Sequence, residues 1–286
     1  MQEVESGIIL LNKPTGMSSN FAVNKVKWLV GAKKAGHLGT LDPLGSGILP
    51  ITINKGTRLF DFFLKKKKVY RAVFKFGVQT DTLDSEGVVT KTCNINICEN
   101  EILKVIGMLL GKQNQLPPQF SAKKINGKKA YELARENIFV ELKTKEVMIY
   151  RFDLIKQICT NTFLFEIECS EGTYIRSLCR DLAALLSTCG IMCAICRTIC
   201  GAMQIEDAYT LDQIKNHQHQ LIKCENAIPL LKYFLKDEFY DDLICGRSVL
   251  VDDIFNEKFL LYCKNEFFGI ARIEDKKVKI ISYLKD

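Results

Sequence analysis

Asp42 is the residue whose surroundings best suit chemistry in this chain of 286 residues. It lies between Leu41 and Pro43, within the glycine- and proline-rich segment 36–50. An aspartate in such a segment is usually a turn former, because its side chain readily bonds its own backbone. Glycines on both sides would also let a ligand or other backbone approach closely. The residue types alone therefore leave a turn former and a reactive carboxylate as alternatives.

A second candidate site is a group of four cysteines, Cys189, Cys193, Cys196 and Cys200. Two of them form a Cys-x-x-Cys pair, a spacing typical of metal ligands. The residues between them are mostly apolar, so the thiols are better interpreted as small core side chains. The chain has 12 cysteines but is larger than a disulfide-rich secreted domain, so we expect them to be reduced.

The charge balance favours a polyanionic partner. Lysine and arginine total 40 against 33 acids, which leaves a net charge of +7. The lysines gather in short clusters at residues 33–34, 65–68, 123–124 and 128–129. No apolar run approaches the roughly 20 residues of a membrane-spanning helix, and residues 1–5 are acidic where a secretory signal is basic. We therefore expect a cytoplasmic monomer without membrane association.

The elements that must position Asp42 can be predicted from local patterns. Residues 7–11 are apolar and indicate a buried strand, and residues 12–16 indicate a turn. A helix is expected next, capped by Ser18 or Ser19 and closed by Gly31. The segment 36–50 is predicted to be a loop of constrained shape, anchored by its leucines. Asp42 is therefore expected to be held on a loop behind a strand and a helix.

Further elements follow along the chain. Alternating apolar residues predict strands at 69–76, 147–154 and 163–169. Helical spacing predicts helices near 102–110 and 175–185, and a short helix is expected at 131–136. Short strand-like runs at 248–251, 259–263, 267–273 and 278–283 predict a small β-rich tail.

The segment 36–50 closely resembles the catalytic motif of the TruB family of tRNA pseudouridine-55 synthases. Segments 12–19, 68–72, 80–87, 121–124 and 172–176 match further motifs of that family in the same order. The resemblance extends over roughly residues 7 to 215. It implies an α+β pseudouridine synthase fold, with a mixed, largely antiparallel sheet flanked by helices. Residues 1–234 would be the catalytic domain, 113–141 its RNA-clamping insertion, and 235–286 a small PUA-like domain.

The implied reaction isomerises the T-arm uridine of tRNA at position 55, breaking the C1′–N1 bond and rejoining the base through C5. No external atom is added, so neither metal nor organic cofactor is expected. Asp42 would be the catalytic carboxylate, by covalent attack at C1′ or by removing a sugar proton, and both routes stay open. Arg176 would pair with Asp42, and Tyr70 would stack on the uracil in a pocket lined by Tyr174. Arg176 could instead be a surface arginine, and the tyrosines ordinary apolar packing.

The resemblance also implies residues that bind the RNA. The uridine must be flipped out, which costs a few kcal/mol, and His37 is placed to contact the opened RNA. Asp84 would support the pocket through hydrogen bonds, and Ile195 would form an apolar wall. The lysines expected to meet phosphates are Lys13, Lys124 and Lys129.

Two positions depart from the family pattern. Cys196 stands where the family usually has an arginine, so any phosphate contact of that arginine must be absent or supplied elsewhere. Leu38 replaces a smaller or polar residue beside His37, which puts the pose of the histidine in doubt. Three rivals stay open: a synthase acting on ribosomal RNA or guided by a partner RNA, a silent RNA-binding protein, and a cysteine-bound metal protein.

Overall fold

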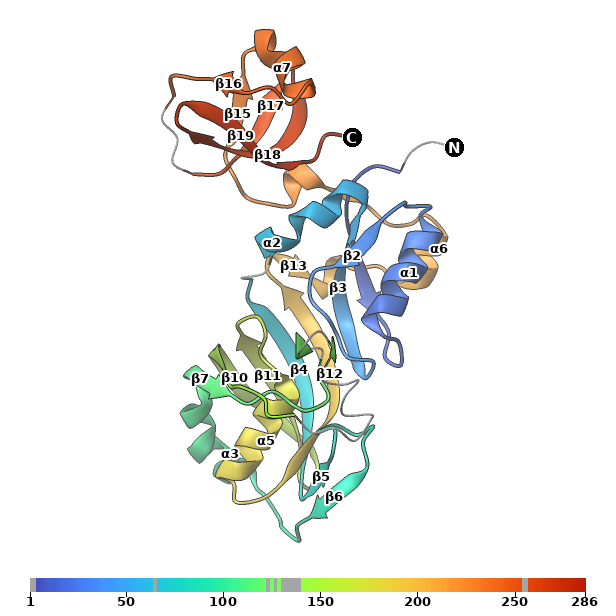
Figure 1. Cartoon of the computed structure of the whole chain (residues 1–286). Helices are drawn as coiled ribbons and strands as arrows, with labels where there is room; N and C mark the ends of the chain where they lie inside the picture. Colours follow the sequence, from blue (N-terminus) through green and yellow to red (C-terminus); the bar gives the residue numbers. More distant parts are fainter. Residues whose placement is uncertain (1–3, 64–65, 122–123, 126–127, 130–139, 254–256) are drawn as a thin grey trace.

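A mixed sheet of ten strands forms the body of the molecule (Figure 1). The computed structural model describes residues 4–63, 66–121, 124–125, 128–129, 140–253 and 257–286. The strands of this sheet are β1 (Gly7–Lys13), β2 (Ala35–His37), β3 (Gly45–Ile53), β4 (Lys68–Phe76), β7 (Gly111–Gln115), β10 (Lys145–Cys159), β11 (Thr162–Cys169), β12 (Gly190–Cys200), β13 (Met203–Gln204) and β14 (Ile222–Lys223).

The strand order is β14-β1-β3-β12-β4-β11-β10-β7, with β2 beside β3 and β13 beside β12. Strands β3 and β12 run parallel, whereas the other paired strands of this sheet are antiparallel. The predicted α+β class with a largely antiparallel mixed sheet is therefore confirmed.

Helices cover this sheet and carry parts of the site. They are α1 (Ser19–Leu29), α2 (Phe60–Phe63), α3 (Glu99–Val105), α5 (Ile175–Leu185) and α6 (Leu211–Lys215), with the short 3-10 helices η1 (Asn54–Leu59), η2 (Ile106–Leu109), η3 (Ile205–Asp207) and η4 (Cys224–Asn226). The α1 N-terminus is capped as predicted, since the Ser18 hydroxyl accepts from the Phe21 amide at 3.2 Å. Helix α1 packs on β3 and α6, and α5 packs on β12 and β4.

The core beside the site is aromatic. Phe74 of β4 packs against Phe165 of β11 with ring centroids 4.9 Å apart, and Phe152 of β10 meets Phe165 at 5.4 Å. These side chains are buried because β4 and β11 alternate apolar and polar residues, as predicted. Burying each contributes roughly 1.5–3 kcal/mol, so this cluster firmly holds the strand that carries Tyr70.

The predicted loop at 36–50 is shorter than expected. Residues 35–37 and 45–53 are strands β2 and β3, and only the segment between them is a loop. The reason is Gly47, whose φ is +96° and whose absent Cβ would lie 2.3 Å from the Arg197 carbonyl oxygen. This glycine lets β3 approach the parallel strand β12, so a residue that suggested a loop is a requirement of strand pairing.

Strand β12 was not predicted, although it is central in the sheet. Its apolar residues and cysteines suggested core packing without a defined element. The strand lies between β3 and β4 and packs on α5, and apart from Arg197 and Thr198 its residues are apolar or cysteine. Its sequence therefore lacks the alternation of apolar and polar residues that reveals a half-buried strand.

A second sheet occupies one end of the molecule, with strand order β15-β17-β18-β19-β16 (Figure 1). Its elements are β15 (Lys232–Leu235), η5 (Asp237–Phe239), α7 (Tyr240–Ile244), β16 (Val249–Leu250), β17 (Phe259–Cys263), β18 (Glu266–Glu274) and β19 (Lys277–Tyr283). The four predicted tail strands are present. The chain end is tied to the first sheet, since the Ser6 amide donates to Asp286 Oδ2 at 2.9 Å.

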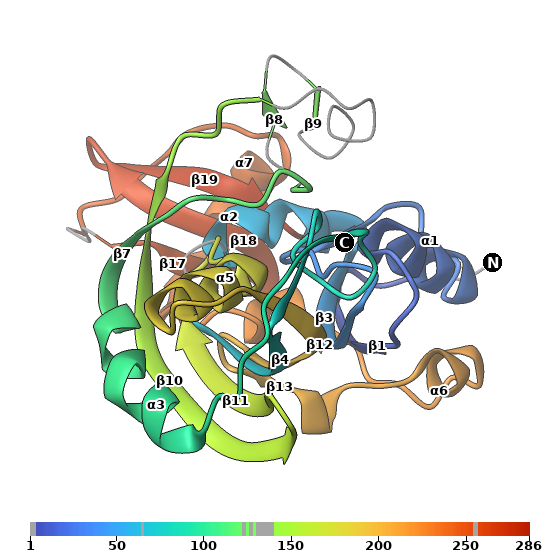
Figure 2. The same ribbon diagram turned by 90° about the horizontal axis from the view of Figure 1, so that it is seen from below.

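Two hairpins project from the first sheet. Strands β5 (Val78–Thr80) and β6 (Val89–Thr92) frame the loop that carries Asp84. Strands β8 (Lys124–Ile125) and β9 (Lys128–Lys129) belong to the predicted insertion and stand away from the sheet in Figure 2. The helix expected at 131–136 lies outside the described residues. No helix in the described part of the chain has the length and apolarity needed to cross a membrane.

Candidate active site

The loop that carries Asp42 is held on both sides. The Ser19 hydroxyl donates to the Leu41 carbonyl at 2.7 Å and accepts from the Leu41 amide at 2.8 Å. On the other side, the Gly16 amide donates to the Pro43 carbonyl and the Gly45 amide to the Asp42 carbonyl. The start of α1 and the preceding turn therefore fix the backbone on which the carboxylate sits.

Lys13 also stabilises this loop. Its side chain is fully buried, and its ammonium donates to the carbonyls of Pro14 at 2.8 Å and Met17 at 2.6 Å. Burial lowers the pKa of Lys13 to about 8, and the charge of Asp42 opposes this shift. The ammonium is thus bonded inside the protein, and a contact of Lys13 with phosphates stays a prediction.

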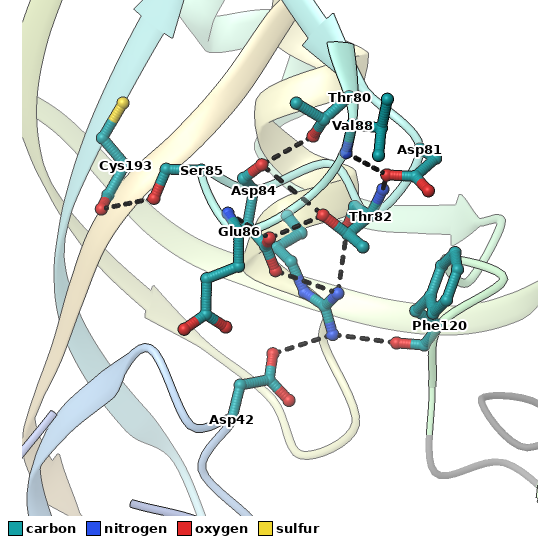
Figure 3. A network of polar contacts seen from close by, with 11 residues as sticks. Asp42, Thr80, Asp81, Thr82, Asp84, Ser85, Glu86, Val88, Phe120 and Cys193 are labelled. Carbon is teal, nitrogen blue, oxygen red and sulfur yellow. Dashed lines mark hydrogen bonds and ion pairs between the residues drawn. The ribbon is translucent and has the colours of Figure 1, made fainter. Parts of the chain in front are cut away.

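Arg176 joins two acidic residues, Asp42 and Asp84 (Figure 3). Its Nη2 lies 2.8 Å from Asp42 Oδ2, and its Nη1 lies 3.3 Å from Asp84 Oδ2. The same two nitrogens donate to the Phe120 and Thr82 carbonyls, both at 3.0 Å. The side chains of Arg176 and Asp84 are each 7% exposed, whereas that of Asp42 is 41% exposed. The guanidinium is thus fixed from the inside, and the Asp42 carboxylate remains accessible to a ligand.

Asp84 acts through Arg176. Its Oδ1 accepts from the Thr82 hydroxyl at 2.6 Å and from the Glu86 amide at 3.1 Å. Because Asp84 bonds its own loop on one side and Arg176 on the other, the guanidinium has little freedom to turn away from Asp42. The site thus contains a buried acid, a buried arginine and an accessible acid in series.

Gln115 at the end of β7 positions the start of α5, a contact that we did not predict. Its side-chain amide donates to the Tyr174 carbonyl at 3.1 Å, and its carbonyl accepts from the Tyr174 amide at 2.8 Å. Helix α5 begins at the next residue and carries Arg176 in its first turn. Only the fold could reveal this role, because no motif connects Gln115 with residues so distant in the sequence.

A pocket of about 230 Å³ opens beside Asp42. Its lining includes four further residues that the resemblance implied, namely Tyr70, Tyr174, Arg176 and Ile195. Burial raises the pKa of both tyrosines, so each remains a neutral phenol at neutral pH. The lining also includes Glu171 and Lys68, and the aromatic and aliphatic side chains among these charged groups suit a flat, mostly uncharged group such as a nucleobase.

Lys68 and Arg197 lie beneath the loop and were not predicted. Arg197 is fully buried, and it donates to the Ile48 carbonyl at 2.9 Å and to the Gly39 carbonyl at 3.1 Å. Lys68 lines the pocket, and burial together with the charge of Arg197 lowers its pKa. Arg197 therefore supports the backbone before Asp42 and places a positive charge below it.

The structure places His37 apart from this pocket. It ends β2, opposite Ile51 of β3, and it is not among the residues that line the pocket. Burial and the charges of Arg197 and Lys68 lower its pKa, so the imidazole is neutral at neutral pH. A contact of His37 with opened RNA stays a prediction. The side chains of Lys124 and Lys129 lie outside the described residues.

The cysteine hypothesis finds no support in the part of the chain that the structure describes. In that part, no group of three or more His, Cys, Asp or Glu side chains could hold a metal ion. The four cysteines are spread along β12 and the residue before it, and Cys189 instead faces Cys93 with sulfurs 3.1 Å apart. Cys196 is half-buried between Ser46 of β3 and Arg71 of β4.

A second cavity is larger than the pocket beside Asp42. A cavity of about 590 Å³ lies between β13, η3 and the segment before the second sheet, lined by Leu10, Phe63, Met203 and Tyr209 among others. In the described residues, neither of its acids, Glu206 and Asp207, forms an ion pair within 4.0 Å. The smaller pocket is the better candidate because it contains the ion pair of Asp42 with the buried Arg176.

Comparisons with known proteins agree with this choice. Residues 27–175 match the model of the TruB family pseudouridylate synthase (N terminal domain). The tRNA pseudouridine synthase B of Clostridium kluyveri is 34% identical over 284 residues, covering 96% of this chain and 98% of that protein. The tRNA pseudouridine synthase B of Caldicellulosiruptor saccharolyticus is 38% identical over 280 residues, covering 95% and 96%.

Solved structures share the fold at lower identity. The chain matches one in a Cbf5-Nop10-Gar1 complex with a TM-score of 0.71 and 22% identity, covering 99% of this chain and 86% of that chain. A chain in an H/ACA RNP bound to a substrate RNA gives a TM-score of 0.70 and 20% identity, with the same coverage. Together with the family match over residues 27–175, the relatives that align along almost their whole length show that this chain belongs to the TruB family of pseudouridylate synthases.

Proposed function

We propose that this enzyme isomerises the T-arm uridine at position 55 of tRNA to pseudouridine, with Asp42 as the catalytic carboxylate. The observation that carries the proposal is the pair of Asp42 with Arg176, 2.8 Å apart at the edge of a pocket lined by aromatic and aliphatic side chains. The names of the full-length relatives support tRNA as the RNA class. The enzyme acts without metal or organic cofactor, as a cytoplasmic monomer.

Each group has a defined task in this proposal. The Asp42 carboxylate, aimed by Arg176, meets the ribose of the flipped-out uridine, either attacking C1′ or removing a sugar proton. Tyr70 and Tyr174 hold the detached uracil while it turns, since an aromatic face retains a base without fixing its rotation. Ile195 closes the apolar side of the pocket. The C1′–N1 bond breaks with its electron pair on the uracil, and C5 then bonds to C1′, displacing Asp42 on the covalent route. C5 loses a proton and N1 gains one, so the product is an isomer of the substrate.

The substitution Asp42→Asn tests the catalytic assignment. Asparagine retains the size of the side chain and an oxygen for Arg176, so the fold should survive while the reactive charge is lost. We expect pseudouridine formation to fall by at least about 100-fold. The matched control is Asp212→Asn, an exposed carboxylate on α6, which should behave like the wild type. An Asp42→Asn protein that stays folded and fully active would leave only an RNA-binding role for the loop.

The choice of RNA is tested with purified components. Unmodified tRNA, incubated with the protein and no guide RNA, should gain pseudouridine at the T-arm uridine. A product found only in ribosomal RNA, or only when a guide RNA is added, would contradict the proposal. The assignment of residues 235–286 to a PUA-like domain, and of residues 113–141 to an RNA clamp, stay predictions.

A further inference from the structure

The outer face of α1 exposes two large aromatic side chains. Phe21 is 59% exposed and Trp28 is 72% exposed. They are seven residues apart, so they lie on the same side of the helix, about 10 Å apart along its axis. Asn24 and Lys25 lie between them, and these four residues line a shallow hollow on the surface. The Lys25 ammonium is 5.0 Å from the centre of the Trp28 ring.

The fold does not require these aromatic residues. Helix α1 packs on the sheet through its opposite face, where Ala22, Val23 and Val26 are buried. Phe21 and Trp28 therefore add apolar surface on the solvent side without filling the core. Two large exposed aromatic side chains that line one hollow are a candidate binding surface.

The charges around this surface favour a polyanion. Residues 19–29 contain Lys25 and Lys27 and no acidic residue. Helix α3 differs, because its exposed apolar residue Leu103 lies near two acidic residues, Glu99 and Glu101, and one lysine, Lys104. Exposed aromatic rings interspersed with lysines are the combination that binds single-stranded nucleic acid, with bases on the rings and phosphates on the ammonium groups. Lysine is depleted from the cores of protein–protein interfaces, which argues against a protein partner.

The surface begins next to the catalytic loop. Ser19, at the start of α1, bonds both backbone groups of Leu41, and Thr15 in the preceding turn donates to the Leu44 carbonyl at 2.9 Å. Phe21 follows Ser19 by two residues on the same helix turn. Two residues turn a helix by about 200°, so Phe21 lies at this end of α1 but on its outer face, away from the side that bonds the loop. An RNA strand that leaves the pocket at Asp42 and crosses the start of α1 would reach Phe21.

We propose that Phe21, Lys25 and Trp28 form a second RNA contact, which stacks unpaired bases of the same RNA whose uridine occupies the pocket. The identity of that RNA rests on the proposed function. Phe21 and Trp28 supply the stacking faces, and Lys25 meets a phosphate between them. This contact extends the footprint of the RNA beyond the reacting nucleotide and helps to hold the opened strand.

The chain contains a built-in probe for this contact, because Trp28 is its single tryptophan. Titrating the wild-type protein with unmodified tRNA should quench the tryptophan fluorescence, with a midpoint equal to the Kd measured by filter binding. The RNA should also protect Trp28 from quenching by acrylamide. Fluorescence and acrylamide access that stay unchanged when filter binding shows the RNA bound would overturn the proposal.

Variants then measure the contribution of the contact to affinity. Loss of a base stack predicts that Phe21→Ala and Trp28→Ala each raise the Kd for tRNA by roughly 5- to 100-fold. Lys25→Ala should reduce the slope of log Kd against log salt by about one unit. The control is Leu103→Ala on α3, which should leave the Kd at the wild-type value. Urea denaturation should show all these proteins folded, since every replaced side chain is exposed.

The outcomes separate this inference from the proposed function. Quenching and weakened variants, combined with no pseudouridine from the wild type, would support the surface and refute the proposed reaction. Normal pseudouridine formation with a Kd in Trp28→Ala equal to that in Leu103→Ala would refute the surface alone. Binding of a protein to α1 without any response to RNA would also refute it.

Discussion

Replacing Arg176 with methionine separates the structural task of this residue from its catalytic task. The guanidinium contacts two carboxylates and two backbone carbonyls, and the side chain is almost fully buried. Methionine fills a similar volume but carries no charge and no hydrogen-bond donor. The two carboxylates then lose the same partner in different environments, because Asp84 is buried and Asp42 is accessible to water.

The expected loss in free energy of unfolding depends on Asp84, whose charge stays buried when Arg176 is replaced. Removing one partner of a buried ion pair costs about 3–5 kcal/mol, because the other charge is left uncompensated. We therefore expect Arg176→Met to lower the free energy of unfolding by about that amount. Adding Asp84→Asn removes the stranded charge, and the asparagine oxygen can still accept from the Thr82 hydroxyl and the Glu86 amide. The double variant should recover roughly 2 kcal/mol or more of the loss.

Two measurements check this reasoning. Urea denaturation gives the free energies for the wild type, both single variants and the double variant, and their double-mutant cycle gives the coupling. Release of hydrogen from C5 of the uridine gives pseudouridine formation, which should stay low in the double variant because Asp42 still lacks its guanidinium. A double variant as unstable as Arg176→Met would refute the account of Asp84. Full activity in that variant would refute the account of Arg176.

Two further predictions concern the supports of the loop. Gly47→Ala should lower the free energy of unfolding by at least about 2 kcal/mol, because the new Cβ meets the Arg197 carbonyl at 2.3 Å. Gly16→Ala, with φ +79° and nothing within 4 Å, should cost only about 1–2 kcal/mol in the same denaturation assay. The folded-state pKa of Lys13, about 8, lies below its ordinary value of 10.5, so the unfolded chain binds more protons between these values. The free energy of unfolding of the wild type minus that of Lys13→Met should therefore rise by about 3 kcal/mol from pH 8 to 10.5. A difference that does not change over this pH range would show that the Lys13 pKa is not lowered.

Local patterns predicted the elements that bury one face. The alternation along β4 and β11, the helical spacing of α5 and the capping serine of α1 each depend on neighbouring residues. The tail strands β16 to β19 were found for the same reason. In β12, where nearly all residues are apolar or cysteine whether buried or not, the sequence shows no alternation and the strand was missed.

Glycines near Asp42 show a different kind of error. The segment 36–50 was expected to be a loop because its glycines and prolines are typical of turns. Gly47 is instead needed where the backbone of β3 passes close to Arg197 of β12. When two strands that are distant in the sequence approach closely, the glycine is the only local sign of it. A glycine can equally indicate a turn, so its presence does not distinguish the two.

By itself, the sequence determined the residue types of the site, the motifs that resemble the TruB family and the periodic elements around them, since all of these are local properties of the chain. Only the tertiary structure decided that Asp84 bonds Arg176 from within, that Lys13 is buried under the loop, and that His37 lies outside the pocket. Strand register and side-chain burial set the distances between these side chains and their exposure to water. Both arise from the packing of segments that are far apart along the chain, which no local pattern records.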